Sequence, residues 1–264
     1  MIEQSDFIDL YNALNINVDK PLRKTCPSAH KCWEKKQETF NEYCVSDPYI
    51  GKYYDENKIL FVAINFRGVG EIGAFEWLIE ADMNNPDSEG VVEQLLAGKK
   101  KVFKQEGYGG TLLFYIIGAT AVCLLQNLGN EKFQMPANKK EAPTPEELAE
   151  VFRYLSIVQL VKCSPDKTER NNPNPQMYSE CPDLLLSKEF EILKPEIVIL
   201  LGNDVYYNFP GKDGFRKVIE KQYVQKYENS KNQKLFKVYH PASLQMQPVS
   251  NREVYFSELR KIQI

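Results

Sequence analysis

Four short apolar runs separated by helical segments constrain the fold of this chain more than any other feature. They read ILFVAIN at residues 59–65, SIVQLVK at 156–162, IVILL at 197–201 and LFKVY at 235–239. The third run contains only isoleucine, valine and leucine, which is typical of a strand covered on both faces. Strands that alternate with helices need crossover connections, which favour a parallel sheet between helix layers. We therefore predict an α/β fold, a three-layer α/β/α sandwich with a central, mostly parallel four-stranded sheet.

Helical signals fill the spaces between these runs. Residues 111–128 form the longest apolar stretch, and residues 182–193 read as a helix that ends before a proline. Two further helices are predicted from capping boxes, in which a hydroxyl residue is followed three positions later by glutamate. Thr144 and Glu147 start a helix that ends near residue 154, and Ser250 and Glu253 start the last one. Residues 66–110 carry weak signals, and residues 207–233 are polar and read as loop plus helix.

The length and composition fit one globular domain. The chain has 264 residues, of which 43% are hydrophobic and 26% charged, so a sizeable core is available. We predict a single domain over residues 1–264, with residues 1–57 as a cysteine-bearing segment that packs on it. The apolar stretch contains Tyr115, Thr120 and Gln126, and it is interpreted as a buried helix, with no membrane contact. No basic leader precedes an apolar run at the N-terminus, so the predicted location is cytoplasmic.

Ligand sites in parallel sheets lie beyond the carboxyl ends of the strands. The residues to inspect first are therefore those that follow the four runs, at 65–68, 163–167, 202–204 and 240–243. The alternative is that these loops hold turn residues only.

Six cysteines are present, and five of them could bear on a metal site. Two near the N-terminus and two around a later loop could converge on one four-thiolate site for an iron–sulfur cluster or a zinc ion. The candidates are Cys26, Cys32, Cys44, Cys163 and Cys181. The alternative is a set of unrelated thiols, since no CxxC is present. Cys123 lies in the apolar stretch and is predicted to be an inert core thiol.

One segment resembles a known family. It reads VKCSP at residues 161–165, followed by Arg170, Pro173, Cys181 and Leu184, and then KPEIVILLG at 194–202. This resembles the iron–sulfur uracil-DNA glycosylases of the family 4 and 5 type, within the uracil-DNA glycosylase superfamily. Shorter anchors are the end of the first run and the HPAS sequence at 240–243. The resemblance implies a DNA glycosylase of base-excision repair that hydrolyses the N-glycosidic bond of uracil or another altered base after base flipping.

The resemblance also implies a [4Fe–4S] cluster with a structural role. Its ligands would be Cys163 and Cys181 together with Cys26 and Cys32, and Cys44 is the reserve. The family usually has a tight CxxC in the N-terminal region, whereas five residues separate Cys26 from Cys32 here. Zinc is the less favoured occupant.

Two catalytic residues follow from the resemblance. Asn65 matches the asparagine that positions the attacking water, although Ala63 and Phe66 replace the glycine and proline usual in that motif. His240 matches the histidine that stabilises negative charge on the departing base. The alternatives are a turn residue that closes a strand and a histidine before a turn proline.

The expected base pocket and DNA contacts differ in part from the family. Gln159 occupies the place of the uracil-reading asparagine, and Gln105 occupies that of the stacking phenylalanine. The resemblance then assigns base binding to Phe66, Phe103, Tyr108 and Gln159. It assigns DNA binding to Lys167, Arg170, Ser243 and Leu244, with Leu244 as the wedge that fills the gap left by a flipped base. These differences bear on the base recognised more than on the fold.

The formal net charge of −3 gives no global basic footprint, so DNA would be bound through a local patch. Lysine and arginine cluster at residues 20–24, 99–104 and 139–140, and each cluster also fits a solvated face. Two other functions stay open. The chain could be a glycosylase-like module that binds DNA or a base without cutting, or an acidic scaffold in a defence or repair assembly.

Overall fold

The protein is described by a computed structural model. It describes residues 2, 4–14, 16, 28, 32, 48–64, 110–133, 150–162, 173–241, 243, 246 and 248–264.

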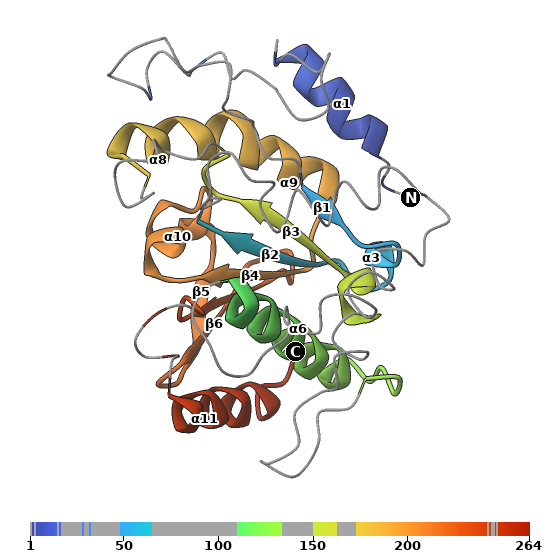
Figure 1. Ribbon diagram of the computed structural model, residues 1–264, viewed down its shortest axis with the longest axis vertical. Helices are drawn as coiled ribbons and strands as arrows, with labels where there is room; N and C mark the ends of the chain where they lie inside the picture. Colours follow the sequence, from blue (N-terminus) through green and yellow to red (C-terminus); the bar gives the residue numbers. More distant parts are fainter. Residues whose placement is uncertain are drawn as a thin grey trace.

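These residues form an α/β fold built on a mixed sheet of seven strands in the order β1-β3-β2-β4-β7-β6-β5 (Figure 1). The middle four strands, β3, β2, β4 and β7, are parallel neighbours. They correspond to the four apolar runs of the sequence. The bounds are β1 Tyr49–Ile50, β2 Ile59–Ala63, β3 Leu155–Gln159, β4 Ile197–Leu201, β5 Arg216–Glu220, β6 Val224–Glu228 and β7 Lys234–Val238.

The prediction of a mostly parallel, four-stranded sheet was wrong in strand number and direction. Strand β1 pairs antiparallel with β3, and the β5–β6 hairpin extends the other side of the sheet antiparallel to β7. Residues 207–233, which were read as loop plus helix, contain both hairpin strands. Both hairpin sequences, RKVIE and VQKYE, are rich in polar residues, so an apolar-run criterion misses them. Strand β5 is largely exposed, whereas β6 is largely buried in spite of its polar sequence.

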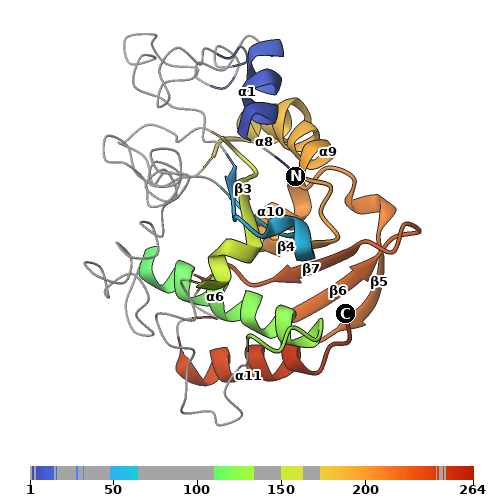
Figure 2. The ribbon, with the colours of Figure 1, turned by 90° about the vertical axis from the view of Figure 1, so that its right-hand side faces the viewer.

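Helices lie on both faces of the sheet. Helices α1, α8, α9 and α10 lie on one face, and α6 and α11 lie on the other (Figures 1 and 2). The helix bounds are α1 Gln4–Ala13, α3 Tyr54–Asn57, α6 Gly110–Asn127, α8 Pro175–Cys181, α9 Ser187–Leu193, α10 Asn203–Asn208 and α11 Val249–Arg260. Single turns occur at Phe152–Tyr154, Pro182–Leu186 and Lys212–Gly214.

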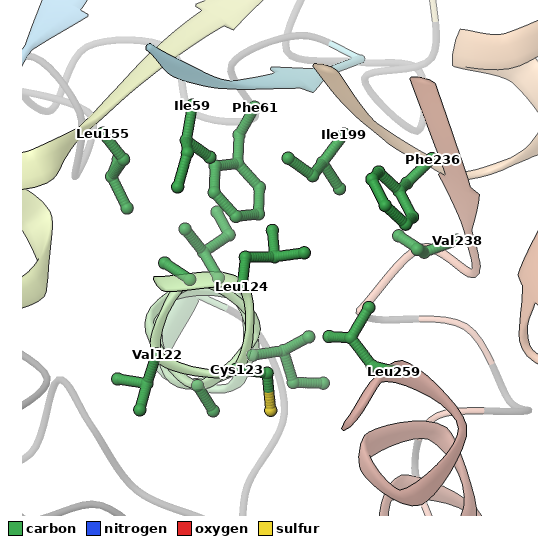
Figure 3. Packing of buried hydrophobic residues seen from close by; sticks show 14 of the residues in the cluster. Ile59, Phe61, Val122, Cys123, Leu124, Leu155, Ile199, Phe236, Val238 and Leu259 are labelled. Atoms are coloured by element: carbon green, nitrogen blue, oxygen red, sulfur yellow. The ribbon is translucent and has the colours of Figure 1, made fainter. Parts of the chain in front are cut away.

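Alternation of side chains along the strands builds a separate core on each face. Ile59 and Phe61 of β2 point towards α6, where Leu124 lies, and Leu259 of α11 completes the same cluster nearer to Val238 of β7 (Figure 3). The intervening residues Leu60 and Val62 point to the opposite face and pack with α1, α9 and α10. Both faces of the middle strands are therefore buried, which is why their sequences are continuously apolar.

The long apolar helix α6 is packed between the sheet and α11 (Figure 3). Its side chains from Tyr115 to Leu125 are buried, and the Thr120 hydroxyl hydrogen-bonds the Tyr255 hydroxyl of α11 at 2.7 Å. The interpretation of this stretch as a buried helix is confirmed. Across the described ranges, no helix is both long and apolar enough to cross a bilayer.

Two helix starts differ from the sequence prediction. The helical segment predicted from residue 182 begins at Pro175, because Asn174 caps it by accepting a hydrogen bond from the Met177 N–H at 2.9 Å. The capping box at Ser250 and Glu253 is not formed. Helix α11 starts at Val249 after Pro248, and no side chain caps it. The Thr144 box lies outside the described residues.

Candidate functional site

The carboxyl ends of the four parallel strands meet at one edge of the sheet, which the β2 arrowhead marks in Figure 1. Pairing continues past the last strand residues. The Leu160 N–H donates to the Ala63 carbonyl at 2.7 Å, and the Val161 N–H donates to the Ile64 carbonyl at 2.9 Å. On the other side, the Gly202 N–H donates to the Val238 carbonyl at 2.9 Å. The edge is therefore a rigid platform for the loops that leave it.

Gln159 closes β3 at this edge and is a buried amide. It pairs with Ala63 across the strands, and its side chain is only 2% exposed. By strand alternation with Leu155 and Ile157, it points to the face covered by α6. Its Oε1 atom is buried and has no hydrogen-bond partner among the described residues. A buried carbonyl oxygen without a partner costs free energy, so this position suits a ligand that brings a donor.

His240 follows β7 at the same edge and is partly exposed. The chain turns sharply after it. The Ser243 N–H donates to the His240 carbonyl at 2.8 Å, and the Met246 N–H donates to the Ser243 carbonyl at 3.0 Å. The Ser243 Oγ atom is buried with no partner in the described part of the chain. These two turns hold His240 and Ser243 in one compact loop over the edge.

Gly202, which directly follows β4, supports His240 from the neighbouring strand. Its φ of +109° and ψ of 167° belong to a region that is essentially restricted to glycine. A Cβ atom built on Gly202 would lie 3.0 Å from the His240 Cβ. The close approach and the backbone conformation both require glycine at this position.

We expect Gly202→Ala to lower the free energy of unfolding by about 1–3 kcal/mol, because alanine is strained in this conformation. It should also lower activity, because the new methyl group displaces His240. Gly211→Ala is the matched control. Its φ is +75°, but no atom lies within 4 Å of the added Cβ. Gly211→Ala should therefore lose stability and keep the turnover of the folded enzyme. Equal turnover of the two variants, normalised to folded protein, would contradict a role of Gly202 in seating His240.

Gln159 and His240 lie on the same edge without touching. Strands β2 and β4 run between β3 and β7, so three strand spacings separate them, roughly 14 Å in total. Asn65 follows β2, one of the two intervening strands, and lies just beyond the described residues.

Two of the predicted metal-ligand cysteines come together. Cys32 and Cys181 are buried in one small cluster with Val161 and Met177. Asn174 strengthens this contact, because its Nδ2 donates to the Cys32 carbonyl at 2.6 Å while its Oδ1 caps α8. Val161 lies two positions before Cys163 in the sequence. Among the described side chains, no group of three or more His, Cys, Asp or Glu is positioned to hold a metal ion.

Cys181 is the last residue of α8 and lies within a longer helical segment, whereas the sequence analysis predicted a helix that starts only after it, at residue 182. A single π-helical turn, Pro182–Leu186, follows it directly, and the Ser187 N–H donates to the Pro182 carbonyl. Pro182 has no N–H to continue an α-helix, and such turns are frequent at functional sites. Cys123, in contrast, is fully buried in α6, and burial raises the pKa of its thiol to about 12. The raised pKa supports the prediction that Cys123 is an inert core thiol.

The predicted site residues that lie outside the described residues are Cys26, Cys44, Asn65, Phe66, Phe103, Gln105, Tyr108, Cys163, Lys167, Arg170 and Leu244.

A buried ion pair lies beside this edge of the sheet, and the sequence analysis did not identify either of its residues. Lys162 Nζ lies 2.5 Å from Glu189 Oε2, and both side chains are 0% exposed. The Tyr11 hydroxyl donates to Glu189 Oε1 at 2.6 Å. The signal for Glu189 was present in the helical periodicity, because Leu186 and Leu193 place it on the buried face of α9.

Comparison with known proteins identifies the family. A family model described as the uracil DNA glycosylase superfamily matches residues 113–261, which is more than half of the 264-residue chain. No curated protein is similar enough to the chain to count as a relative. The matched region contains β3, β4 and β7, and with them Gln159, Gly202 and His240. The chain belongs to the uracil-DNA glycosylase superfamily.

Proposed function

We propose that this protein is a DNA glycosylase that hydrolyses the N-glycosidic bond of uracil or another altered base after flipping it out of the stack. Superfamily membership suggests a glycosylase-like function on DNA. The observation that carries the proposal is the placement of Gln159 and His240 on one sheet edge. Gln159 is a buried amide whose Oε1 has no hydrogen-bond partner among the described residues.

The chemistry suits these two groups. The bond breaks with positive charge on the sugar and negative charge on the base. His240 would donate a hydrogen bond to the departing base, and a fixed donor in a shielded site stabilises such charge strongly. Gln159 would read the flipped base with its amide. Its Oε1, which none of the described donors reaches, would accept a hydrogen bond from an N–H on the base edge.

The remaining roles rest on sequence position. Asn65, next in the chain after the paired residue Ile64, would hold the attacking water. Phe66, Phe103 or Tyr108 would stack on the base. Lys167, Arg170 and Ser243 would contact phosphates, and Leu244 would fill the gap in the stack.

We further propose that Cys26, Cys32, Cys163 and Cys181 hold a [4Fe–4S] cluster, as in the family 4 and 5 type. The burial of Cys32 and Cys181 in one cluster with Val161 supports this set. Four thiolates are the usual ligands of such a cluster. Bound there, the cluster would cross-link the N-terminal segment, the loop after β3 and α8. Base excision needs no electron transfer, so the role is structural.

Cys181→Ala should reduce the iron and acid-labile sulfide bound per chain, whereas Cys123→Ala should leave both unchanged. The reason is that Cys181 supplies a proposed ligand, while Cys123 is a core thiol in α6. Anaerobic purification followed by metal analysis and visible absorption measures this. A colourless wild-type protein that contains only zinc would contradict the iron–sulfur proposal.

The test of the proposed activity is base release. Purified protein would be incubated with single-stranded and duplex DNA that carries uracil, hypoxanthine or another altered base, and abasic sites would be counted. We expect release of at least one base. If folded protein that binds the DNA releases none of them, the glycosylase proposal fails.

A binding module without cleavage is the second candidate. Gln159 favours it, because its amide is one methylene longer than the asparagine usual in the family, which changes the pocket. This candidate predicts DNA affinity without turnover. Loss of a measured excision activity in His240→Ala would contradict it.

A further inference from the structure

A lysine of the sheet lies over two tyrosine rings of helix α10. The Lys237 Nζ atom is 4.7 Å from the ring centre of Tyr206 and 5.1 Å from that of Tyr207. The two rings are in edge contact with each other, with their centres 5.6 Å apart. Helix α10 packs beside β4 and β7, and Lys237 belongs to β7. Strand and helix therefore present one ammonium group and two aromatic rings at a common surface.

No carboxylate forms an ion pair with Lys237 in the part of the chain that the structure describes. Partial burial and the ammonium group of Lys217 both lower the pKa of Lys237, and Glu220 has a smaller effect in the opposite direction. Both oxygens of Glu220 are already bound, one to Lys217 Nζ at 2.9 Å and the other to Gln225 Nε2 at 3.1 Å. A negatively charged ligand would stabilise the charged form of Lys237, so this position favours an anion.

Two further lysines lie around the same surface. Lys217 of β5 is close enough to Lys237 to lower its pKa through charge repulsion. Lys212 Nζ donates a hydrogen bond to the Tyr207 carbonyl, which places this ammonium group beside the end of α10. Several ammonium groups around one exposed ring match a chain of phosphates better than a single small anion.

Tyr207 narrows the class of anion. It is 59% exposed, more than any other large apolar or aromatic residue that the structure describes. Exposed aromatic rings within a basic surface are a typical binding site for single-stranded nucleic acid, because each base offers a face that stacks on the ring. In a duplex the bases already stack on one another. The surface therefore fits a single strand better than a duplex.

This surface lies close to the proposed catalytic edge. His240 is three residues after Lys237, and three residues of extended chain span at most roughly 11 Å. Helix α10 begins directly after Gly202, which packs against His240. One strand of DNA could therefore reach both the edge and the surface beside α10.

We propose that this surface binds single-stranded DNA next to the catalytic edge. We name it the tyrosine–lysine patch, and its residues are Tyr206, Tyr207, Lys212, Lys217 and Lys237. A base stacks on Tyr207, and the neighbouring phosphates lie against Lys237 and Lys217. This inference rests on the proposed function, because it specifies the DNA substrate as a single strand or a locally unpaired segment.

The test measures binding of a fluorescent oligothymidylate by fluorescence anisotropy. This single strand carries no altered base, so the result does not depend on base release. Tyr207→Ala should weaken binding at least about 5-fold, which is the lower end of the effect of one stacked base. Lys237→Gln should reduce the slope of log affinity against log salt concentration by about 0.7, as expected for the loss of one phosphate contact to a single strand. Binding of duplex DNA should not change in Tyr207→Ala.

Two variants are matched controls. Lys231→Gln removes an exposed lysine from the turn between β6 and β7. Val254→Ala removes a side chain that is 42% exposed on α11, on the other face of the sheet. Neither should change the affinity for the single strand. Thermal unfolding checks that all variants are folded, and the exposure of Tyr207 should make alanine well tolerated there.

Unchanged affinity of folded Tyr207→Ala for the single strand would overturn the proposal. An equal loss on an abasic oligonucleotide would also overturn it, because no base would then stack on the ring. If Lys237→Gln lost binding to polyglutamate and kept its DNA binding, the patch would bind an acidic protein instead. A wild-type protein that binds the single strand through the patch and releases no base would support this inference, while the glycosylase proposal would fail.

Discussion

Replacing His240 with alanine should lower the rate constant for base release by about 100- to 1,000-fold, the usual cost of removing one donor that stabilises transition-state charge. We assign to the His240 imidazole, just after β7, the role of stabilising the negative charge on the leaving base. Alanine keeps the Cβ atom against which Gly202 packs, so the local fold should persist. Single-turnover kinetics at saturating DNA measures this step without a contribution from binding.

Two variants control this result. His240→Asn keeps a side-chain amide donor, so it should retain more activity than alanine. Tyr239→Phe changes the preceding residue and keeps the ring that packs on Tyr223, so its rate should match the wild type. Thermal unfolding should be similar for all of them. A folded His240→Ala protein that releases the base at the wild-type rate would refute the assignment.

Replacing Glu189 with alanine should lower the free energy of unfolding by about 3–5 kcal/mol, which is the usual effect of leaving one charge of a buried pair without its partner. Lys162 would keep a buried ammonium, and the Tyr11 hydroxyl would lose its acceptor. Urea unfolding followed by circular dichroism measures the change. If the free energy of unfolding depends on urea concentration with the same slope in both proteins, the two free energies can be compared as two-state values.

The exposed pair Lys217–Glu220 gives the matched comparison. Its nitrogen and oxygen lie 2.9 Å apart, but water screens both groups. Glu220→Ala should therefore cost less than about 1 kcal/mol. If Glu189→Ala and Glu220→Ala lowered the free energy of unfolding by the same small amount, Lys162 and Glu189 would not form a buried ion pair in solution.

The parallel middle of the sheet could be predicted because burial on both faces leaves a direct mark on sequence. The run 197–201 matches β4 residue for residue, and the other three strands agree to within a few residues. His240 could be selected for the same reason, since it directly follows an apolar run, whereas Gln159 lies within the run 156–162 and was selected only through the family resemblance. The prediction failed in the hairpin, where the strand sequences are polar. Strand β5 carries charges on exposed positions, and β6 buries Lys226, whose ammonium donates to the Gln263 carbonyl, so neither strand leaves an apolar run.

Local helix signals were less reliable than strand signals. The Ser250–Glu253 box is a valid pattern, but α11 starts one residue earlier, after Pro248. The helical segment around Cys181 starts at Pro175, because Asn174 is both its cap and a contact to the Cys32 carbonyl. A short capping pattern marks one residue at which a helix could begin, and packing selects the residue at which it does begin.

The sequence by itself determined the α/β class, the four parallel strands and the residues that stand at their carboxyl ends, because periodicity and burial are properties of neighbouring residues. Tertiary structure alone decided that Cys32 packs with Cys181, that Glu189 meets Lys162 and Tyr11, and that Gly202 supports His240. These contacts join residues far apart in the chain. They depend on strand order, register and the placement of helices, which no local pattern encodes.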